Sequence, residues 1–296
     1  MQKVLIIVGP TASGKSGLAV RLAKKFGGEV VSADSRQVYR GLDIGTGKIS
    51  KKEMAGIPHH LLDVASPKHA YSAGDWTKAA HKTIATIARR NELPIVVGGT
   101  GFYIDALAGR IDLPDVAPNL KLRSSLSKKT AAQLFTMLKK KDKKRARLMD
   151  TPSERNNKVR LIRALEIAAA PKQKKAGTPK YDILWIGVSP AASALDKKIR
   201  IRLFARIRAG MVAEARRLKK GGLSYTRMRE LGLEYRSLAD LLENKISKQE
   251  FIETLCREIR RYARKQTGYW NRNELIEWFD PRDSKKIAAR VGTWLT

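Results

Sequence analysis

Five short apolar runs are spaced along the chain and alternate with segments of helical periodicity. The runs lie at residues 4–8, 29–32, 61–64, 93–97 and 181–188, and each predicts a buried strand. Between them, apolar residues recur three or four positions apart, which predicts amphipathic helices. Strands that alternate with helices are typical of a parallel sheet. We therefore predict an α/β fold with a parallel sheet flanked by helices.

The pattern changes in the middle of the chain, at residues 111–180. Strand signals vanish there, and basic helical segments replace them. Residues 171–179 are rich in Pro, Gly and Lys, a composition typical of a linker. The densest charge run, at 139–147, is more typical of a solvated face than of a specific site. We predict an all-helical insertion at 111–180 within an α/β core formed by 1–110 and 181–296.

Two amphipathic helices are predicted in the C-terminal half. The first has one continuous apolar stripe, which consists of Ile199, Leu203, Ile207, Met211 and Leu218. We therefore predict a single long helix that ends at the glycine pair 221–222. The second helix has a basic side, formed by Arg257, Arg260, Arg261, Arg264 and Lys265. A basic stripe suits a phosphate backbone, and a solvated surface is the alternative.

A glycine-rich turn joins the first strand to the helix that follows it. Its pattern is G-x-x-x-x-G-K-S, and its residues are Gly9, Pro10, Thr11, Ala12, Ser13, Gly14, Lys15 and Ser16. A strand, this turn and a helix in that order predict a phosphate-binding loop, so the expected core is similar to the P-loop NTPases. Backbone N–H groups and the helix N-terminus would surround an anion. Lys15 would reach the outer phosphates, and the Ser16 hydroxyl would bind Mg²⁺.

Polar residues follow the next two strands. Asp34 comes after the strand at 29–32, so we expect it at the same edge of the sheet as the phosphate loop. Its carboxylate would bind Mg²⁺, act as a general base, or cap the next helix. Thr100 follows the strand at 93–97, where a hydrolysing P-loop NTPase usually has an acidic residue. The two glycines before it, at 98–99, predict that something large approaches the backbone.

The charge balance indicates a polyanionic partner. The 296 residues include 60 Lys and Arg but only 28 Asp and Glu, which gives a net charge of +32. Nucleic acid is the simplest partner for this excess. A charge that serves only solubility is the alternative.

Composition also argues against several kinds of site. The single cysteine, Cys256, excludes a disulfide framework and a cysteine-rich zinc finger. The adjacent His59 and His60 have no Cys or third His nearby, so we interpret them as structural or RNA-facing. No apolar run approaches the ~20 residues that span a membrane. The N-terminus does not resemble a signal peptide. We therefore expect a cytoplasmic protein with no membrane partner.

Several motifs in one order resemble the tRNA dimethylallyltransferases, a bacterial-type branch of the IPP transferase family. The resemblance extends from about residue 4 to about residue 270. The most specific part is Asp-Ser-x-Gln-Val-Tyr at 34–39, followed by Asp-Ile-Gly-Thr at 43–46. The motifs that carry it lie at 9–16, 34–39, 42–46, 58–63, 71–72, 98–100 and 163–166.

The resemblance implies a reaction and a set of roles. Dimethylallyl diphosphate would be held by the phosphate loop with Mg²⁺, and the exocyclic amino nitrogen of the adenosine 3′ to the anticodon would attack its allylic carbon. Asp34 resembles the base of the family, Thr100 resembles the residue that bonds near the reacting nitrogen, and Lys15 would stabilise the leaving diphosphate. The target base would be flipped out of its stack. The insertion at 111–180 would clamp the anticodon stem-loop, and we expect a monomer.

The family's tRNA contacts also map onto this chain. The matching positions are Asp34, Ser35, Arg36, Gln37, Thr100, Arg123, Val159, Arg160, Leu161, Ile162 and Arg163. Three places depart from the family pattern, namely the segments 231–235 and 259–266 and the tryptophan that follows, which is displaced or replaced by Tyr269.

Three other functions are compatible with a phosphate loop. An enzyme that prenylates free adenine nucleotides is the nearest alternative, and the long basic insertion favours tRNA over a free nucleotide. A P-loop kinase of small molecules would not explain the charge excess. A nucleotide-switched RNA-binding protein is disfavoured, because the chain lacks the Asn-Lys-x-Asp guanine signature.

Overall fold

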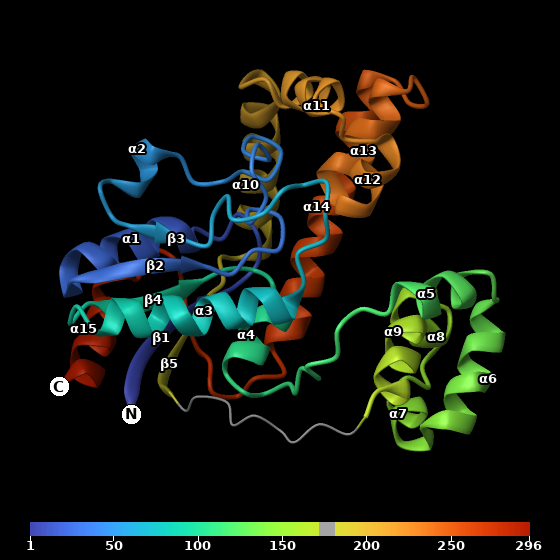
Figure 1. The fold of residues 1–296 in the computed structure, drawn as a ribbon. Coiled ribbons are helices and arrows are strands. Elements are labelled where there is room, and N and C mark those ends of the chain that lie inside the picture. The colour runs from blue at the N-terminus through green and yellow to red at the C-terminus, as the bar shows by residue number, and fades with distance from the viewer. Residues whose placement is uncertain (172–180) are drawn as a thin grey trace. The chain divides into compact units, whose positions relative to one another are not determined.

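The computed structural model describes residues 1–171 and 181–296 of the chain (Figure 1). The chain divides into two compact units. The first comprises Met1–Ile111 with Thr178–Thr296, and the second comprises Asp112–Gly177.

The second unit falls inside the range 111–180, where the sequence predicts an insertion. Most of the linker predicted at 171–179 lies outside the described residues. None of the described helices is long and apolar enough to cross a membrane.

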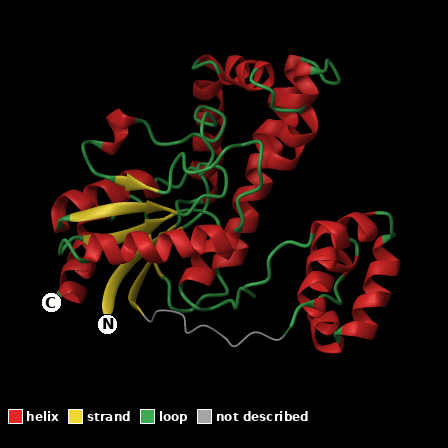
Figure 2. Ribbon diagram, viewed as in Figure 1, coloured by secondary structure: helices red, strands yellow, loops and turns green. Residues whose placement is uncertain are grey.

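A six-stranded parallel sheet forms the centre of the first unit (Figure 2). Its strands in chain order are β1 (Gln2–Val8), β2 (Gly28–Ser32), β3 (His59–His60), β4 (Leu93–Val97), β5 (Tyr181–Val188) and β6 (Glu277–Phe279). In space they follow the order β3-β2-β4-β1-β5-β6. Helices flank this sheet, so the predicted α/β fold is confirmed.

The central strand β1 is buried on both faces, because its side chains alternate between two hydrophobic cores. Leu5 and Ile7 belong to the core shared with α1 (Lys15–Phe26) and α15 (Ser284–Leu295). Val4 and Ile6 belong to the core shared with α3 (Ala73–Ala88) and α4 (Gly101–Leu107). The near-continuous apolar run of β1 is therefore what a strand covered by helices on both sides requires.

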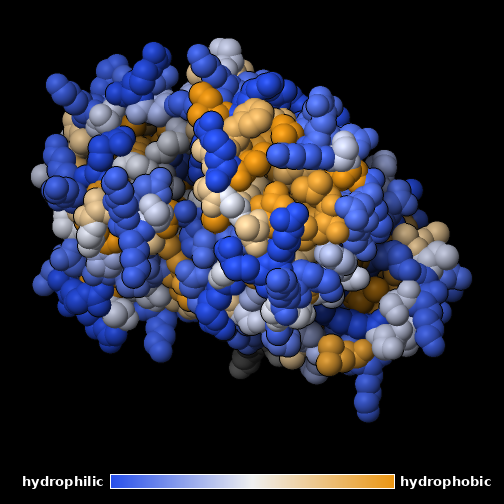
Figure 3. Space-filling view, turned by 90° about the horizontal axis from the view of Figure 1, so that it is seen from above, coloured by the Kyte–Doolittle hydropathy of each residue, from blue (hydrophilic) through white to orange (hydrophobic). Residues whose placement is uncertain are grey.

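Five further helices of the first unit extend the second of these cores away from the sheet. They are α10 (Ala192–Arg208), α11 (Met211–Lys220), α12 (Tyr225–Leu231), α13 (Leu233–Leu242) and α14 (Lys248–Trp270). The short helix α2 (Lys51–Met54) lies in the connection between β2 and β3. Seen from above, the surface shows an apolar area surrounded by hydrophilic side chains (Figure 3). Trp270, at the end of α14, is fully buried, and its ring lies 6.4 Å from that of Trp185 in β5.

The prediction of one long helix ending at 221–222 is wrong. The chain forms two helices, α10 and α11, which are separated at Gly210. Gly210 has a φ of 99°, in the left-handed region that an α-helix does not contain. The apolar stripe passes through this break because both helices pack on the same core, so periodicity alone could not reveal it.

The prediction of a strand at 61–64 is also wrong, since the strand β3 comprises only His59–His60. Leu61 and Asp63 have φ values of 60° and 56°, which a strand does not allow. The chain turns there to bond the loop after β2: Ala65 N–H donates to the Val38 carbonyl at 2.9 Å. Strand β6 has three residues, too few to show a period in the sequence.

The second unit is a small helical bundle around its own core. Its helices are α5 (Leu120–Ser127), α6 (Ala131–Lys141), α7 (Lys143–Leu148), α8 (Pro152–Arg155) and α9 (Lys158–Ala169). Each begins at a side chain that accepts a backbone N–H of the first turn: Asn119, Thr130, Asp142, Thr151 and Asn157. The core contains Leu126, Leu134, Phe135, Leu138, Ala146, Leu161, Ala164 and Leu165.

Candidate active site at the carboxyl edge of the sheet

The glycine-rich turn leaves β1 at the carboxyl edge of the sheet and enters α1. A side chain at Gly9, whose φ is 142°, would collide with the carbonyl oxygen of Val188 on the neighbouring strand β5. Gly14 has a φ of 98° and is the N-cap of α1. Both glycines therefore stand where the backbone requires them, and the strand, loop and helix have the arrangement of a phosphate-binding loop.

The ammonium group of Lys15 lies over this loop. Its Nζ donates to the carbonyl oxygen of Pro10 at 2.6 Å, and the side chain is buried. Burial is the main cause that lowers the pKa of Lys15 to about 7; the positive charge of Arg202 acts in the same direction, and the carboxylate of Asp34 opposes both. An anion beside Lys15 would stabilise its charged form. Ser16, the next residue of α1, is exposed.

Asp34 and Thr100 lie together at the ends of the adjacent strands β2 and β4. The Thr100 hydroxyl oxygen accepts the N–H of Ser35 at 3.0 Å, and the Thr100 N–H donates to the carbonyl of Ala33 at 3.2 Å. A side chain at Gly98 would collide with that same carbonyl group. The close contact of the two strand ends therefore explains this glycine, and it places Asp34 and Thr100 at the same edge as the phosphate loop.

The carboxylate of Asp34 is half-buried and fixed by the backbone that follows it. Its Oδ1 accepts the N–H groups of Arg36 at 2.8 Å and Gln37 at 3.3 Å. Within residues 1–171 and 181–296, no donor bonds its Oδ2. The side chain thus caps the turn after β2 with one oxygen, and the other oxygen has no hydrogen-bond donor in the described parts of the chain.

The large group that approaches the glycines after β4 is part of the protein itself. A side chain at Gly99 would collide with the amide of Gln266, and one at Gly101 would collide with the ring of Tyr269. Both belong to α14. Gln266 accepts the N–H of Thr11 at 2.8 Å and donates to the Gly99 carbonyl at 2.9 Å. The sequence predicts the close approach but not the helix that makes it.

The loop at 42–47 is held by helices from the C-terminal half, which sequence reasoning missed. The buried carboxylate of Glu214 in α11 accepts the N–H groups of Asp43, Ile44 and Gly45 at 2.7–3.0 Å. It also accepts the hydroxyl of Tyr235 in α13 at 2.7 Å. A side chain at Gly45 would lie 2.6 Å from that hydroxyl. Tyr235 stands in a segment that departs from the family pattern, yet it supports this loop.

Two arginines one helical turn apart on α10 add positive charge near the loops. Arg206 donates to the carbonyl of Gly45 at 2.6 Å and pairs with Glu234 at 3.0 Å. Arg202 lies beside Gly47, where a side chain would be 3.2 Å from its guanidinium. With Lys15, these groups could hold the phosphates of a ligand. The spacing of four residues between the two arginines could have predicted from the sequence that they share one face of a helix.

The adjacent histidines have protein partners. His60 Nε2 lies 2.5 Å from the carboxylate of Glu29, which Arg90 also binds, and His59 Nδ1 lies 2.8 Å from the carbonyl of Ile57. In the described parts of the chain, no three His, Cys, Asp or Glu side chains are grouped so that they could hold a metal ion. The contacts of His60 agree with the structural interpretation of the pair.

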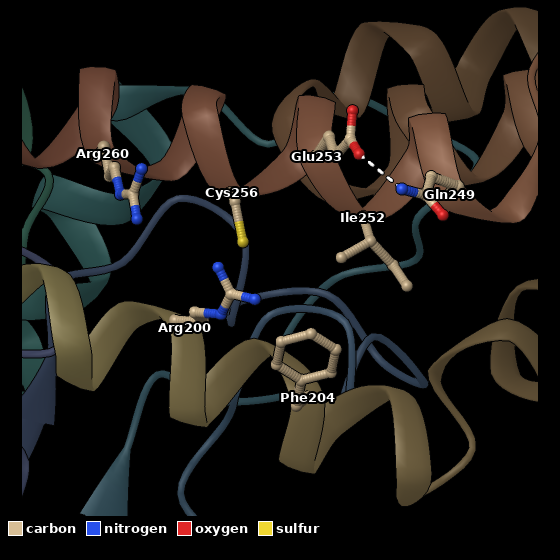
Figure 4. A pocket seen from close by; sticks show the side chains of 7 residues that line it. All are labelled: Arg200, Phe204, Gln249, Ile252, Glu253, Cys256 and Arg260. Carbon is tan, nitrogen blue, oxygen red and sulfur yellow. Dashed lines mark hydrogen bonds between the residues drawn. The ribbon is translucent and has the colours of Figure 1, made fainter.

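A pocket of about 420 Å³ lies between α10 and α14 (Figure 4). It is lined by Arg200, Phe204, Gln249, Ile252, Glu253, Cys256 and Arg260. None of these residues belongs to the phosphate loop or to the ends of β2 and β4. The pocket is therefore distinct from the candidate active site.

In the second unit, two of the predicted tRNA contacts share one buried carboxylate. Glu166 accepts Arg123 Nε at 2.7 Å, Arg163 Nη1 at 3.2 Å and the N–H of Asn119 at 2.8 Å. Burial acts to raise the pKa of Glu166, but the bonds from Arg123, Asn119 and Arg163 outweigh it and lower the pKa to about 2. The two guanidinium groups are held in place, and the side chains stay partly exposed, at 42% for Arg123 and 33% for Arg163.

The stretch 159–163 does not present all its predicted contacts to solvent. Val159 and Arg160 are exposed on α9, whereas Leu161 is fully buried in the core of the second unit. The side chain of Leu161 is thus not accessible at the surface, and its assignment as a tRNA contact stays a prediction. The reason for the burial is helical periodicity, which turns one residue of such a run inward.

Comparison with known proteins gives consistent matches over the whole chain. The model of the IPP transferase family matches residues 37–274. A tRNA dimethylallyltransferase of Pediococcus pentosaceus is 38% identical, over 100% of this chain and 97% of its own. The crystal structure of the full-length tRNA isopentenylpyrophosphate transferase from Bacillus halodurans is 34% identical, with a TM-score of 0.75 over 99% of this chain and 96% of its own.

A further solved structure, of a eukaryotic dimethylallyltransferase acting on tRNA, is 26% identical, with a TM-score of 0.80 over 95% of this chain and 74% of its own. The family match covers most of the chain, and the bacterial relatives align along nearly all of it. The chain therefore belongs to the IPP transferase family.

Proposed function

We propose that this protein transfers a dimethylallyl group from dimethylallyl diphosphate to the exocyclic N6 of the adenosine 3′ to the anticodon in tRNA. The observation that carries the proposal is the meeting of two groups of residues at one edge of the sheet. The phosphate loop would hold the diphosphate, and Asp34 with Thr100 would face the nucleophile. The tRNA dimethylallyltransferases that resemble this chain support the choice of both substrates.

In this reaction the N6 nitrogen forms a bond to the allylic carbon while the bond from that carbon to the diphosphate oxygen breaks. Negative charge develops on the leaving diphosphate. The loop N–H groups and Lys15 would stabilise it, with Arg202 and Arg206 nearby. Because the pKa of Lys15 lies at about 7, binding of the diphosphate would restore its full positive charge.

The proton leaves N6 as the new bond forms. Asp34 would accept it on Oδ2, since Oδ1 is bound to the backbone N–H groups of Arg36 and Gln37. The hydroxyl of Thr100 accepts the N–H of Ser35, so its own hydrogen is available to a polar atom of the adenine. The two side chains would thereby orient the base and remove its proton.

The residues at the loop also fit Mg²⁺. The Ser16 hydroxyl is exposed at the N-terminal end of α1, and Asp34 stands at the same edge of the sheet. Mg²⁺ typically takes one or two protein oxygens and completes its shell with phosphate oxygens and water. When bound, it would neutralise charge on the diphosphate, and Ser16 would be its protein ligand.

The net charge of +32 and the partly exposed side chains of Arg123 and Arg163 support a large RNA substrate rather than a free nucleotide. The adenosine would leave its stack to reach Asp34. A tRNA substrate is compatible with the cytoplasmic location that we propose.

Label transfer from radiolabelled dimethylallyl diphosphate in the presence of Mg²⁺ tests the proposal. Unmodified tRNA, AMP and ATP are offered in separate reactions, together with a matched tRNA that has guanosine in place of the target adenosine. We expect label in the first tRNA alone. Label in AMP or ATP would contradict the tRNA specificity, and label in the guanosine variant would contradict the target position.

A further inference from the structure

Gln266 joins two loops of the candidate active site that are far apart in sequence. It lies on α14 and is 6% exposed. Its Oε1 accepts the N–H of Thr11, the third residue of the phosphate loop, at 2.8 Å. Its Nε2 donates to the carbonyl of Gly99, the residue before Thr100, at 2.9 Å.

The two partners determine which side chain can stand at this position. Thr11 offers a backbone donor and Gly99 a backbone acceptor, so the amide orientation of Gln266 is fixed by chemistry. An ionised Glu of the same length would accept from Thr11 but could not donate to Gly99, and Leu would do neither. The fit also depends on Gly99, because any side chain there would collide with the Gln266 amide.

The two hydrogen bonds of Gln266 lie just beyond the end of the sheet. The last hydrogen bond of the ladder between β1 and β4 runs from Gly98 N–H to the Ile7 carbonyl at 3.3 Å. Beyond that point the chain from β1 becomes the phosphate loop, and the chain from β4 becomes the Gly99–Thr100 turn. Gln266 continues the connection in place of backbone hydrogen bonds.

The connection extends from Gln266 to the proposed base. Gly99 is followed by Thr100, and the Thr100 hydroxyl is bound by the N–H of Ser35, the residue after Asp34. One helical turn earlier on α14, Tyr262 stands near Asp34, whose charge adds to burial in raising the pKa of the Tyr262 hydroxyl. Helix α14 thus bonds the phosphate loop and the end of β4 directly, and its Tyr262 lies within electrostatic reach of Asp34.

We propose that Gln266 is a positioning residue that sets the separation between the phosphate loop and the end of β4. It thereby aligns the bound allylic diphosphate with Thr100 and Asp34. This inference rests on the proposed function, because alignment is measured through transfer. A misplacement of about 1 Å at a reacting group can cost about 10²-fold in rate.

The first test compares Gln266→Leu with Leu255→Ala. Leu255 is fully buried on the same helix, about three turns before Gln266, and its side chain has no polar atom that could bond either loop. We expect Gln266→Leu to lower kcat/KM for dimethylallyl diphosphate by about 10²-fold, with tRNA affinity within twofold of wild type. Leu255→Ala should lower the melting temperature while kcat/KM stays within a few-fold. Equal kcat/KM losses in both variants would overturn the proposal.

The second test measures kcat/KM of Gln266→Glu as a function of pH. It does not depend on Gln266→Leu, so it can still be made if that variant fails to fold. A protonated Glu can donate to Gly99, whereas an ionised one cannot and also places negative charge beside the loop. The ratio of variant to wild-type kcat/KM should therefore rise as the pH falls. A ratio that does not change with pH would overturn the proposal. Absence of transfer by the wild type would instead refute the proposed function, so the two failures are distinguishable.

Discussion

Positive charge is held in two different ways in the two units. Lys15, at the phosphate loop, is bound by the neutral carbonyl of Pro10, and Arg202 stands near enough to repel it. Arg123 and Arg163, in the helical unit, are bound by the buried carboxylate of Glu166. The pKa of Lys15 is consequently lowered to about 7, while the pKa of Glu166 is lowered to about 2.

This difference indicates what each site is suited to do. Among the residues that the structure describes, no carboxylate is in direct contact with the charge on Lys15, so an anionic ligand gains most by binding there. The arginines are already compensated, so a ligand gains less from their charge and more from their fixed geometry. Under the proposed function, the first site would serve the charge changes of the reaction, and the second would recognise a phosphate backbone through preformed donors.

The largest expected effect concerns Asp34, whose carboxylate acts on the charge of Lys15. Asp34→Ala should reduce kcat by about 10²–10⁴-fold, the contribution typical of a general base. Binding of tRNA should stay within a few-fold, because the substitution leaves the guanidinium groups of the helical unit unchanged. Single-turnover kinetics and filter binding measure the two quantities. An unchanged kcat would remove Asp34 from the role of base.

Removal of the positive charge of Lys15 should weaken diphosphate binding. We expect Lys15→Ala to raise the Kd for dimethylallyl diphosphate by at least about tenfold, or about 1.4 kcal/mol. Lys24→Ala is the matched control, since Lys24 lies on the exposed side of the same helix. Isothermal titration calorimetry gives both values. Equal affinities in the two variants would contradict the assignment of the phosphate loop.

Loss of the buried carboxylate should affect the stability of the helical unit and not the chemistry. Glu166→Gln leaves Arg123 and Arg163 without their charged partner, and we expect a cost of about 2 kcal/mol, less than for fully buried pairs because the arginines are partly exposed. The free energy of unfolding in urea measures it. The kcat at saturating tRNA should be unchanged, and a large fall in kcat would contradict the separation of roles.

In the wild type, acid should remove the stabilisation that the ionised carboxylate of Glu166 gives to the folded protein. The pKa of Glu166 is lower in the folded protein than in the unfolded chain, so its stabilisation is complete above about pH 4.3 and is lost as the pH falls towards 2. Unfolding in urea across this range should show a smaller loss for Glu166→Gln than for the wild type. If the free energy of unfolding changed with pH in the same way in both proteins, Glu166 would not be the titrating group.

The smallest expected effect is a proton uptake at the phosphate loop. Because the pKa of Lys15 is lowered to about 7, Lys15 is neutral in a fraction of the protein molecules at neutral pH. Diphosphate binding would favour the charged form. Affinity for the diphosphate should therefore decline as the pH rises above about 7. Calorimetry in two buffers of different ionisation enthalpy detects the uptake, and Lys15→Ala should abolish it.

The features that the sequence predicts well are local or follow from sheet geometry. The phosphate loop depends on a strand, two glycines and a helix within the first residues of the chain. Asp34 and Thr100 follow parallel strands, whose carboxyl ends meet at one edge. These positions could be placed without knowing how distant segments pack.

The features that were missed depend on contacts across the chain. Gln266, Glu214 and Tyr235 support loops that precede them by about 170 residues or more, and no local pattern indicates which loop each one reaches. The break at Gly210 was hidden because the apolar stripe continues on both sides of it. The burial of Leu161 was also not predicted, because the residue was assigned by its position in a motif and not by its face on α9.

Nucleoside analysis of the reacted tRNA tests the central claim most directly. Purified protein, dimethylallyl diphosphate, Mg²⁺ and an unmodified tRNA are incubated, and the RNA is then digested and examined by mass spectrometry. The account predicts N6-dimethylallyladenosine from the position 3′ to the anticodon with the wild type, and nearly none with Asp34→Ala. Unmodified adenosine with the folded wild type, or equal product with both proteins, would contradict it.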